Sequence, residues 1–544
     1  MSTQTAQPSI TPTDTISRPF HVVVSDPLPS EALARLETIA QITARDSFPP
    51  DELTELLKTA DALLVRSGTK VTADLIAGAT RLRIVGRAGV GVDNIDVKAC
   101  TQKGIIVVNS PEGNTISAAE HTVALMLALF RHIPQAAAST ARGEWKRKKF
   151  TGQELYAKTV GIVGLGKIGR EVASRVLAFK TRVLVFDPFI TAEHARELNI
   201  ESVDLETVLK EADVLTVHTP LTRETRGLIG KKQLATMKQG ARIVNVARGG
   251  IIDQDALAEA LTSGHIGGAA LDVFVDEPPA GSPLLDMPNV ICTPHLGAST
   301  EEAQMKVAFD VAEQVALVLE GQPARAPVNI PSLPAEQMAQ LAPFIQLADR
   351  MGSLLGQLTT RSVKQVDVNY SGDICQMRLE AVTWSVLKGL LSVTQAETVN
   401  FVNAPHIAAQ FGIAFQEARQ PQKRSYLDRI EVVVHADGEE HRCEGAIFGQ
   451  GDPRVISIDN HRLDLHPAGH KLLTWQADAP GVVGRLGTFL GTRNINIVDM
   501  QVGRDHPRGN ALMVLSTDEP AGPTLVDEIR AMPGIHDAKE IHLG

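Results

Sequence analysis

The sequence is poor in cysteine and in aromatic residues. Among its 544 residues there are four cysteines, and aromatic side chains make up 4% of the chain. The cysteines lie far apart, with neither the paired spacing of a zinc site nor the density of a disulfide framework. This usage favours a reducing compartment. The four are Cys100, Cys292, Cys375 and Cys443.

The sequence also lacks an excess of positive charge, a long apolar run and a signal peptide. The net charge of -10 offers no extended basic face, so we expect no nucleic acid and no anionic membrane as a partner. The longest apolar run, 122–130, is too short to span a bilayer. Residues 1–18 are rich in Ser, Thr, Gln and Pro, which indicates a disordered tail and not a targeting peptide. We therefore expect a cytoplasmic protein.

The length predicts three or four domains. Between residues 20 and 109, short apolar runs alternate with helical stretches, which is typical of a parallel α/β sheet. Residues 117–138 predict a long helix that leads to a second domain, with Ser117 as its cap and Glu120 completing a capping box. The second domain contains five predicted strands, at 160–163, 182–186, 213–217, 242–246 and 268–272.

Residues 299–320 show another long helical pattern, which we expect to return the chain to the first domain. The second domain, 116–296, is then inserted into a discontinuous first domain made of 19–115 and 297–330. An active site between the two is expected, because small-molecule sites are frequent at domain interfaces.

A turn of the form G-x-G-x-x-G follows the first strand of the second domain. Gly164 permits a tight turn, Gly166 lets the backbone approach a pyrophosphate, and Gly169 lets the helix pack on the strand. Asp187 ends the next strand, where a carboxylate accepts hydrogen bonds from the adenosine ribose. Three glycines alone also fit a structural turn, but Asp187 favours a dinucleotide site. Since a carboxylate repels a 2′-phosphate, the cofactor expected is NAD and not NADP.

Three polar residues follow later strands of the same domain: Arg248, Glu277 and His295. In an open α/β sheet, positions beyond the carboxyl ends of strands face one crevice. Arg248 suits the carboxylate and carbonyl of a 2-keto acid, and His295 can exchange the proton of the alcohol. Glu277 would orient the imidazole, although before two prolines it could also be a turn residue. Asp272 is expected to face the nicotinamide, with a turn-capping role as the alternative.

The C-terminal part begins after a proline-rich segment, 323–334, which resembles a linker. Residues 335–465 mix helical and strand-like runs without a site motif. Residues 470–544 predict a ferredoxin-like β-α-β-β-α-β module. The expected fold class is therefore α/β, with two Rossmann-like or flavodoxin-like parallel-sheet domains, one inserted in the other, followed by an α+β domain and a ferredoxin-like domain.

The glycine turn with Asp187, together with the segments VNVARGG, LDVF, EPP and TPHLGAST, resembles the D-isomer-specific 2-hydroxyacid dehydrogenases over about residues 20–330. The resemblance implies NAD as cofactor, Arg248 and Glu277 as catalytic residues, and His295 as the proton donor or acceptor. It also implies cofactor contacts at Lys167, Ile168, Asp187, Val246, Ala247, Arg248, Asp272, His295, Leu296, Gly297 and Ala298.

Further features resemble the branch of this family that oxidises 3-phosphoglycerate to 3-phosphohydroxypyruvate, the first step of the phosphorylated route to L-serine. A phosphorylated substrate requires additional cations, which Arg66, Arg87 and Arg147 can supply. Arg147 would reach the site of a neighbouring subunit, which implies a homo-oligomer, a dimer or a tetramer. On composition alone, residues 146–149 are equally a solvated basic patch.

The C-terminal module resembles an ACT domain, which binds small amino acids between two copies. Residues 335–465 resemble the intervening allosteric domain of the long members of this branch. The resemblance implies L-serine as an effector, with Asp478 and Asn496 as contacts, although Asp478 could equally cap a turn.

Two other functions are considered. A glyoxylate or hydroxypyruvate reductase uses the same Arg-Glu-His set, but it needs neither an ACT-like module nor extra arginines. An NAD-sensing scaffold shares the fold but not the amino-acid-sensing module.

Overall fold

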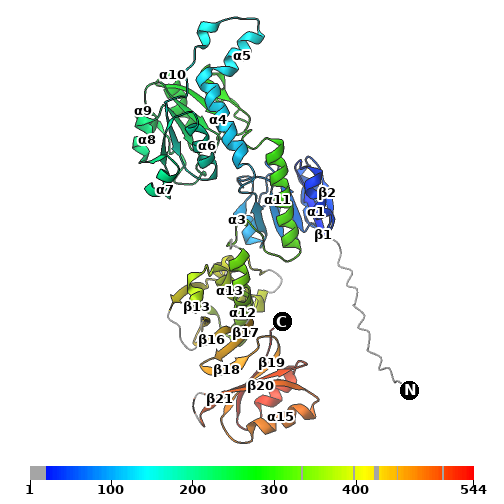
Figure 1. Ribbon diagram of the computed structural model, residues 1–544. Coiled ribbons are helices and arrows are strands. Elements are labelled where there is room, and N and C mark those ends of the chain that lie inside the picture. The colour runs from blue at the N-terminus through cyan, green and yellow to red at the C-terminus, as the bar shows by residue number, and fades with distance from the viewer. Residues whose placement is uncertain are drawn as a thin grey trace, which may run out of the picture.

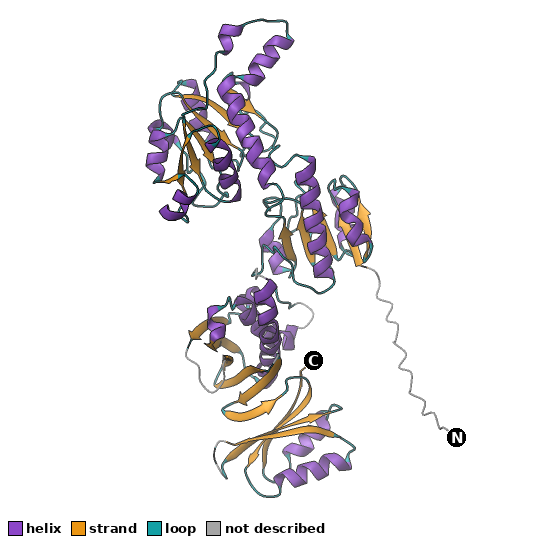
Figure 2. Cartoon of the chain, in the orientation of Figure 1, coloured by secondary structure: helices purple, strands orange, loops and turns teal. Residues whose placement is uncertain are grey.

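The computed structural model describes residues 20–331, 335–395, 399–421, 428–449, 451–504, 506 and 508–543. The predicted tail, 1–18, lies outside them. Figure 1 shows four bodies that follow one another along the chain, and Figure 2 shows that each contains its own sheet.

The first body is a five-stranded sheet in the order β2-β1-β3-β4-β5, in which every pairing is parallel. This order is flavodoxin-like and places a switch point between β1 and β3. One face packs on α1 and α11, and residues of α2 and α3 pack on the other. The elements are β1 Phe20–Val24, α1 Ser30–Glu37, β2 Ala40–Ala44, α2 Pro50–Leu57, β3 Ala62–Val65, β4 Ile84–Arg87, α3 Val97–Gln102 and β5 Ile106–Asn109.

The chain returns to this sheet through α11, Glu301–Leu319, as the sequence predicts. Thr300 caps the helix by accepting a hydrogen bond from the N–H of Ala303. Its buried residues, such as Val311 and Val315, contact the core that includes Val22 and Leu64. The second sheet is therefore inserted between β5 and α11.

The second body is a seven-stranded parallel sheet in the order β12-β11-β10-β9-β6-β7-β8. The order reverses between β6 and β9, which is the Rossmann switch point. All five strands predicted here are confirmed, whereas the short strands β8 and β12 were not predicted. The elements are β6 Thr159–Val163, α6 Lys167–Leu177, β7 Arg182–Phe186, α7 Ala192–Glu197, β8 Glu201–Ser202, α8 Leu205–Glu211, β9 Val214–Val217, α9 Lys231–Thr236, β10 Ala241–Asn245, α10 Gln254–Thr262, β11 Ile266–Leu271, η2 Pro283–Asp286 and β12 Val290–Cys292.

The helix predicted at 117–138 is two helices, α4 Thr115–Arg131 and α5 Ile133–Ala141. His132 between them has a left-handed backbone with φ 53°. Pro134 follows in the first turn of α5, where its missing N–H costs nothing, whereas inside one continuous helix it would remove a hydrogen bond.

The predicted capping box is wrong. The helix begins at Thr115, two residues before Ser117, and Asn114 at its N-cap makes no side-chain hydrogen bond. Ser117 is buried inside α4, and its hydroxyl has no partner among the described residues. Glu120 instead forms an ion pair with Arg175 of α6 at 3.6 Å. The capping-box spacing therefore predicts a helix start further along the chain than the observed start at Thr115.

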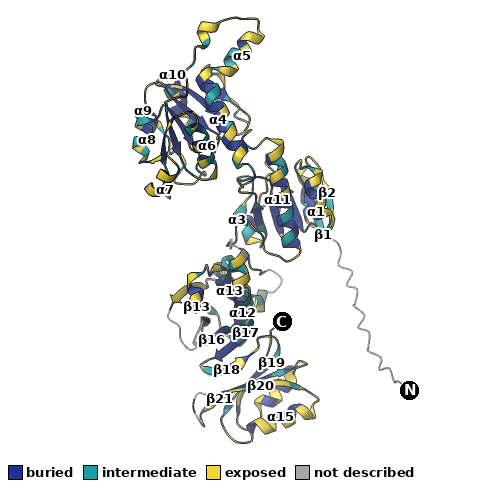
Figure 3. Ribbon diagram, viewed as in Figure 1, coloured by how far each residue is buried: buried dark blue, intermediate teal, exposed yellow. Residues whose placement is uncertain are grey.

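The third body is a six-stranded sheet in the order β14-β13-β15-β16-β17-β18, with α12 and α13 packed on it. Figure 3 shows the buried interior of these helices and strands. The elements are α12 Ala335–Leu358, β13 Val363–Gly372, η3 Asp373–Gln376, α13 Glu380–Gln395, α14 Ala404–Gln410, β14 Ala414–Gln420, β15 Asp428–Ala436, β16 Glu439–Phe448, β17 Asp452–Ile458 and β18 His461–Leu465.

The segment predicted as a linker is hydrogen-bonded to the first sheet through Val328 and Asn329. The N–H of Val328 donates to the carbonyl of Val107 at 2.7 Å, and Asn329 accepts from the N–H of Val107 at 2.8 Å. Asn329 also donates to the carbonyl of Ile105 at 2.8 Å. Proline blocks a helix here but allows this short extended pairing along β5.

The fourth body is the predicted ferredoxin-like sheet, in the antiparallel order β20-β21-β19-β22. Two helices cover one face, and the other face packs against α12 of the third body. The elements are β19 Gly469–Ala477, α15 Val482–Thr492, β20 Ile497–Arg504, β21 Asn510–Thr517, α16 Pro523–Arg530 and β22 Ile535–Leu543.

Candidate active site

The glycine turn follows β6 and has the geometry that a dinucleotide requires. Gly164 has φ +93°, and a Cβ there would lie 2.8 Å from the carbonyl oxygen of His218. A Cβ at Gly169 would lie 2.2 Å from the carbonyl oxygen of Gly164. A Cβ at Gly166 would meet nothing within 4 Å, so this glycine faces open space. The turn therefore leaves an approach for a pyrophosphate at Gly166.

The N-terminus of α6 adjoins this open space. Gly166 is its N-cap and provides no side-chain partner, so the N–H groups of the first turn remain available to an anion. Lys167 turns its side chain to Glu112, with 2.6 Å between Nζ and Oε1, and Ile168 packs on the core. The backbone of these two residues, and not their side chains, is therefore what a phosphate would meet.

Asp187 lies at the end of β7, beside the glycine turn. Its Oδ2 accepts a hydrogen bond from the N–H of Leu165 at 2.7 Å, and its Oδ1 accepts from the N–H of Phe189 at 2.8 Å. Each carboxylate oxygen can accept a second hydrogen bond. The arrangement holds the carboxylate where a ribose would lie, so the residues present fit NAD.

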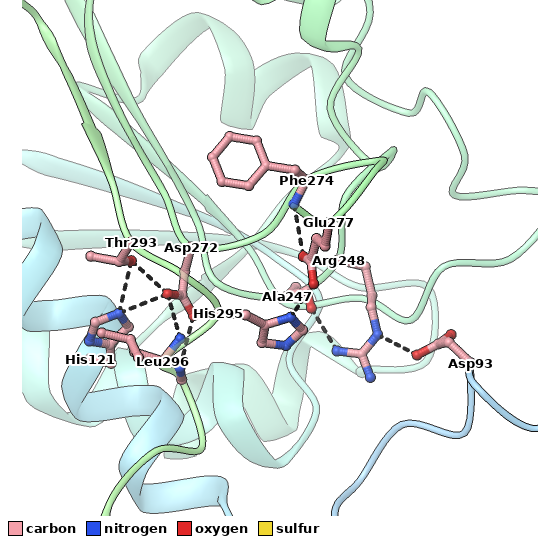
Figure 4. A network of polar contacts seen from close by, with 11 residues as sticks. Asp93, His121, Ala247, Arg248, Asp272, Phe274, Glu277, Thr293, His295 and Leu296 are labelled. Atoms are coloured by element: carbon pink, nitrogen blue, oxygen red, sulfur yellow. Dashed lines mark hydrogen bonds and ion pairs between the residues drawn. The ribbon is translucent and has the colours of Figure 1, made fainter. Parts of the chain in front are cut away.

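His295 and Glu277 form a hydrogen-bonded pair (Figure 4), with 2.7 Å between Nδ1 and Oε2. Glu277 also accepts from the N–H of Phe274 at 3.0 Å. Burial alone would raise the pKa of Glu277, but these two hydrogen bonds outweigh it and lower that pKa. An ionised carboxylate can only accept, so Nδ1 carries a proton and Nε2 is left for chemistry. Nε2 has no hydrogen-bond partner in the described part of the chain.

The backbone around His295 is unusual. His295 has φ 55°, a left-handed conformation that residues other than glycine rarely adopt. Its N–H donates to the carbonyl of Asp272 at 3.0 Å, which helps to hold this conformation. The imidazole remains 47% exposed. A catalytic group has to be both fixed and reachable, and His295 is both.

The hydrogen bonds of Asp272 are those of a residue that caps a turn, the second of the two roles expected from the sequence. Its side chain is fully buried, and it accepts hydrogen bonds from Thr293 Oγ1 at 2.6 Å, from His121 Nε2 at 3.2 Å, and from the N–H groups of Leu296 and Gly297 at 2.7 and 2.8 Å. Burial opposes its ionisation, but these donors lower its pKa. Its contact with the nicotinamide stays a prediction. Asp272 fixes the loop that carries His295.

Arg248 is held by both parallel-sheet bodies. Its Nε donates to Asp93, which lies after β4, at 3.0 Å, and its Nη1 donates to the carbonyl of Ala247 at 2.7 Å. The N–H of Ala247 in turn donates to the side chain of Asn245 at 3.0 Å, and Val246 is buried beneath. Figure 4 shows Asp93 reaching Arg248 from the separate ribbon of the first body. The Nη2 of Arg248 makes no hydrogen bond with the described residues.

Arg87 lies within electrostatic reach of Arg248 and of Arg66. Burial, followed by the positive charge of Arg248, lowers the pKa of Arg87 to about 10, with Arg66 adding to the effect and Asp93 opposing it. The Nε of Arg87 is buried without a partner among the described atoms. The charges of Arg248 and Arg66 act on Arg87 against those of Asp93 and Asp26, and guanidinium groups in such a region are suited to a bound anion.

The structure does not bring Arg147 into this cluster. It lies in η1, Arg147–Phe150, is exposed, and makes no hydrogen bond or ion pair with any residue that the structure describes. Ala298 is half-buried two residues beyond Leu296 on the His295 loop. The other residues predicted for catalysis, substrate and cofactor lie at or just beyond the carboxyl ends of strands in the two parallel sheets.

Sequence reasoning missed Asp93, His121 and His218. Asp93 and His218 follow strands β4 and β9, so the rule that found Arg248 would also have found them. His121 lies inside α4, and no spacing in the sequence signals its contact with Asp272.

The two residues proposed for effector binding lie beside opposite ends of β21, Asp478 after β19 and Asn496 before β20. The register pairs Ala477 with Asn510 at the start of β21 and Ile497 with Thr517 at its end. Asp478 and Asn496 flank these positions and therefore do not meet within one chain. Asp478 accepts from the N–H of Arg508 at 2.9 Å and from Arg504 at 3.2 Å, while Asn496 donates to Asp518 at 2.7 Å.

Neither a membrane-spanning helix nor a metal site is found among the described residues. None of their helices combines the length and the apolar character needed to cross a membrane. No group of three or more His, Cys, Asp or Glu among them is arranged to hold a metal ion.

Three segments of the chain match known domain families. Residues 123–297 match the NAD binding domain of the D-isomer specific 2-hydroxyacid dehydrogenases, 340–459 match the D-3-phosphoglycerate dehydrogenase intervening domain, and 470–534 match the ACT domain. The solved structure of the TT0316 protein from Thermus thermophilus is similar to 57% of this chain and to 100% of that chain, with 36% identity and a TM-score of 0.53. The fold and site thus define an NAD-dependent oxidoreductase of the 2-hydroxyacid dehydrogenase class.

Similarity over the whole chain gives the particular family. D-3-phosphoglycerate dehydrogenase of Synechocystis sp. is 45% identical over 523 residues, which are 96% of this chain and 94% of that protein. The Bacillus subtilis enzyme of the same name is 45% identical over 527 residues, 96% of this chain and 100% of that protein. The chain belongs to the D-3-phosphoglycerate dehydrogenase family.

Proposed function

We propose that the protein oxidises D-3-phosphoglycerate to 3-phosphohydroxypyruvate with NAD, as the first step of the phosphorylated route to L-serine. The observation that carries this proposal is Arg248 beside His295 and Glu277 (Figure 4), together with Arg87, whose pKa is lowered in part by the charges of Arg248 and Arg66. A substrate with a carboxylate and a phosphate supplies the negative charge that this cluster lacks.

In the proposed reaction, Nε2 of His295 accepts the proton of the C2 hydroxyl group. Glu277 fixes the imidazole through Nδ1 and stabilises the imidazolium that forms. Arg248 holds the substrate carboxylate and the developing carbonyl through its planar fork, and Asp93 keeps that fork in place.

The glycine turn at Gly164 and Gly166, the first N–H groups of α6 and Asp187 would hold NAD. When bound, NAD would supply the acceptor for the hydride that leaves C2. One proton at His295 and one hydride to the cofactor balance the oxidation.

The experiment is a comparison of initial rates with D-3-phosphoglycerate, D-glycerate and D-lactate. We expect the highest kcat/KM for the phosphorylated acid, since only this substrate engages Arg66 and Arg87 as well as Arg248. A preference for an unphosphorylated acid would keep the hydride chemistry but remove the phosphate role of these arginines.

We also propose a homo-oligomer in which Arg147 reaches the site of a second copy. Around it, Ile133, Trp145 and Tyr156 are 53%, 81% and 59% exposed, an unusual amount of large apolar surface for one stretch of chain. Light scattering of the wild type and of Trp145→Ser tests this, since a change to monomer is expected only if the surface is an interface.

For the ACT domain we propose L-serine as effector, bound between two copies. Because Asp478 and Asn496 lie at opposite ends of β21, one complete site requires Asp478 of one copy and Asn496 of another. Asp478→Ala and Asn496→Ala should each abolish serine inhibition. A co-expressed mixture of the two variants should recover part of it, because an interface between the two different variants contains one site with both native residues. No recovery in mixed oligomers would contradict a shared site.

The proposal keeps the domain boundaries expected from the sequence: 19–115 with 297–330 for substrate, 116–296 for NAD, 335–465 for the intervening domain and 470–544 for the ACT domain. We also propose that the protein is located in the cytoplasm, which cell fractionation would test.

A further inference from the structure

A cavity of about 750 Å³ lies between the five-stranded sheet and the intervening domain. The loops before β4 and β5 and the end of α11 form one wall, and the segment 399–411 forms the other. One hydrogen bond joins the two walls, from Asn400 Nδ2 to the carbonyl of Gly104 at 2.9 Å. The cavity is of the size that small-molecule sites have.

The cavity is separate from the active site. Arg83 lines it just before β4 begins, whereas Arg87 ends the same strand at the crevice of His295. The two arginines therefore lie at opposite ends of β4. A molecule in the cavity would contact the amino ends of the strands, while the substrate contacts the carboxyl ends.

The charge of the lining is one-sided. Arg81, Arg83 and Lys103 line the cavity, and no Asp or Glu among the described residues does. Arg81 is paired with Asp61 at 3.0 Å. Arg83 donates only to two backbone carbonyls at the end of α11, and Lys103 donates to the carbonyl of Ala77 at 2.6 Å. Within the described ranges, neither of these two cations has a carboxylate partner, so their charge is not neutralised.

The remaining lining suits an organic molecule better than a bare ion. Phe401 and Phe411 provide apolar surface, and Gln102, Gln322 and Gln410 provide amide groups. We propose that the cavity binds a small organic anion, with a phosphate or carboxylate at the cations and an apolar body along the phenylalanines. This site goes beyond the proposed function, because it joins the substrate-binding body to the intervening domain.

Trp384 offers a reporter of this cavity. Its ring lies 5.7 Å from the ring of Phe401, centroid to centroid. The chain has three tryptophans, so replacing Trp145 and Trp475 by Phe leaves Trp384 alone. Its fluorescence is titrated with three probes, namely inorganic phosphate, citrate and AMP. We expect a saturable change with at least one of them.

Lys103→Gln is the test variant, and Lys98→Gln on the neighbouring helix α3, exposed and outside the cavity, is its matched control. Loss of one charge-assisted contact should weaken binding of the responding probe by about tenfold or more. The control should bind as the parent does. Arg87→Gln should also leave the affinity unchanged, because it lies at the other end of β4.

Three results would overturn the proposal: no response to any probe, equal weakening by Lys103→Gln and Lys98→Gln, or loss of the response in Arg87→Gln. Should the double tryptophan replacement fail to fold, the rise in unfolding temperature with each probe is measured in the otherwise native protein and in both lysine variants. The proposal then requires that a probe raises the unfolding temperature less in Lys103→Gln than in the native protein or in Lys98→Gln. None of these readouts depends on turnover, so failure here leaves the proposed reaction untouched.

Discussion

Two histidine–carboxylate pairs in this molecule have nearly the same geometry but different surroundings. At the active site, His295 Nδ1 lies 2.7 Å from Glu277. In the intervening domain, His441 Nδ1 lies 2.9 Å from Asp459. The first imidazole is 47% exposed at a crevice, and the second is 21% exposed within a sheet. The pair alone therefore does not define a catalytic site.

The local backbone explains the difference. His441 lies within β16, and Asp459 occupies the tight turn between β17 and β18 with φ 44°. Asp459 also accepts from the N–H of Arg442 at 2.9 Å, so that this pair fastens one hairpin to its neighbour. His295 instead lies in a strained loop beyond a strand end, with the arginine cluster nearby. Exposure and neighbouring charge decide which pair can move a substrate proton.

The largest predicted effect separates the two histidines directly. His295→Ala should lower kcat by about 10²- to 10⁴-fold, because the proton acceptor is lost. NADH binding, followed by its fluorescence, should persist, since the glycine turn and Asp187 are unchanged. His441→Ala is the matched control and should retain kcat. Equal inactivation by the two replacements in folded protein would break the comparison.

Much of the active site could be predicted, because the residues that follow parallel strands lie at the same edge of a sheet. Arg248, Glu277 and His295 are far apart in the sequence, and this rule alone brings them together. Asp272 was harder, because its partner His121 comes from the middle of a helix. The regulatory pair was hardest, since Asp478 and Asn496 lie beside opposite ends of β21 and can share a site only if a second copy is present.

The next prediction tests the role of neighbouring charge. Arg87→Gln should raise the KM for 3-phosphoglycerate by about 10- to 100-fold, as expected for a lost hydrogen bond to a charged group. It should not lower the unfolding temperature of the free protein, because Arg87 is a buried cation whose pKa is depressed to about 10 by burial and by Arg248. Functional sites often carry such a cost in stability.

The informative control for Arg87 is Arg83→Gln, at the other end of β4. Arg83 donates to the last carbonyls of α11, so its loss should lower the unfolding temperature with little effect on KM. If Arg87→Gln behaves like this control, Arg87 is a structural residue and the anion site loses its main support.

The smallest predicted effect concerns the pH dependence of the structural pair. The hydrogen bond to Asp459 raises the pKa of His441 above its ordinary value of 6.5. The folded protein therefore keeps this proton to a higher pH than the unfolded chain does. The stabilisation is complete below the unfolded pKa and is lost as the pH rises through the folded pKa.

The free energies of unfolding of the wild type and of His441→Gln should thus differ most near about pH 5 and least near about pH 9, with a maximum difference of about 1 kcal/mol or less. Denaturant titrations of both proteins across this range measure the difference. A difference that grows with pH would show that the imidazole stabilises the hairpin in its neutral form, and the contrast with His295 would then rest on exposure alone.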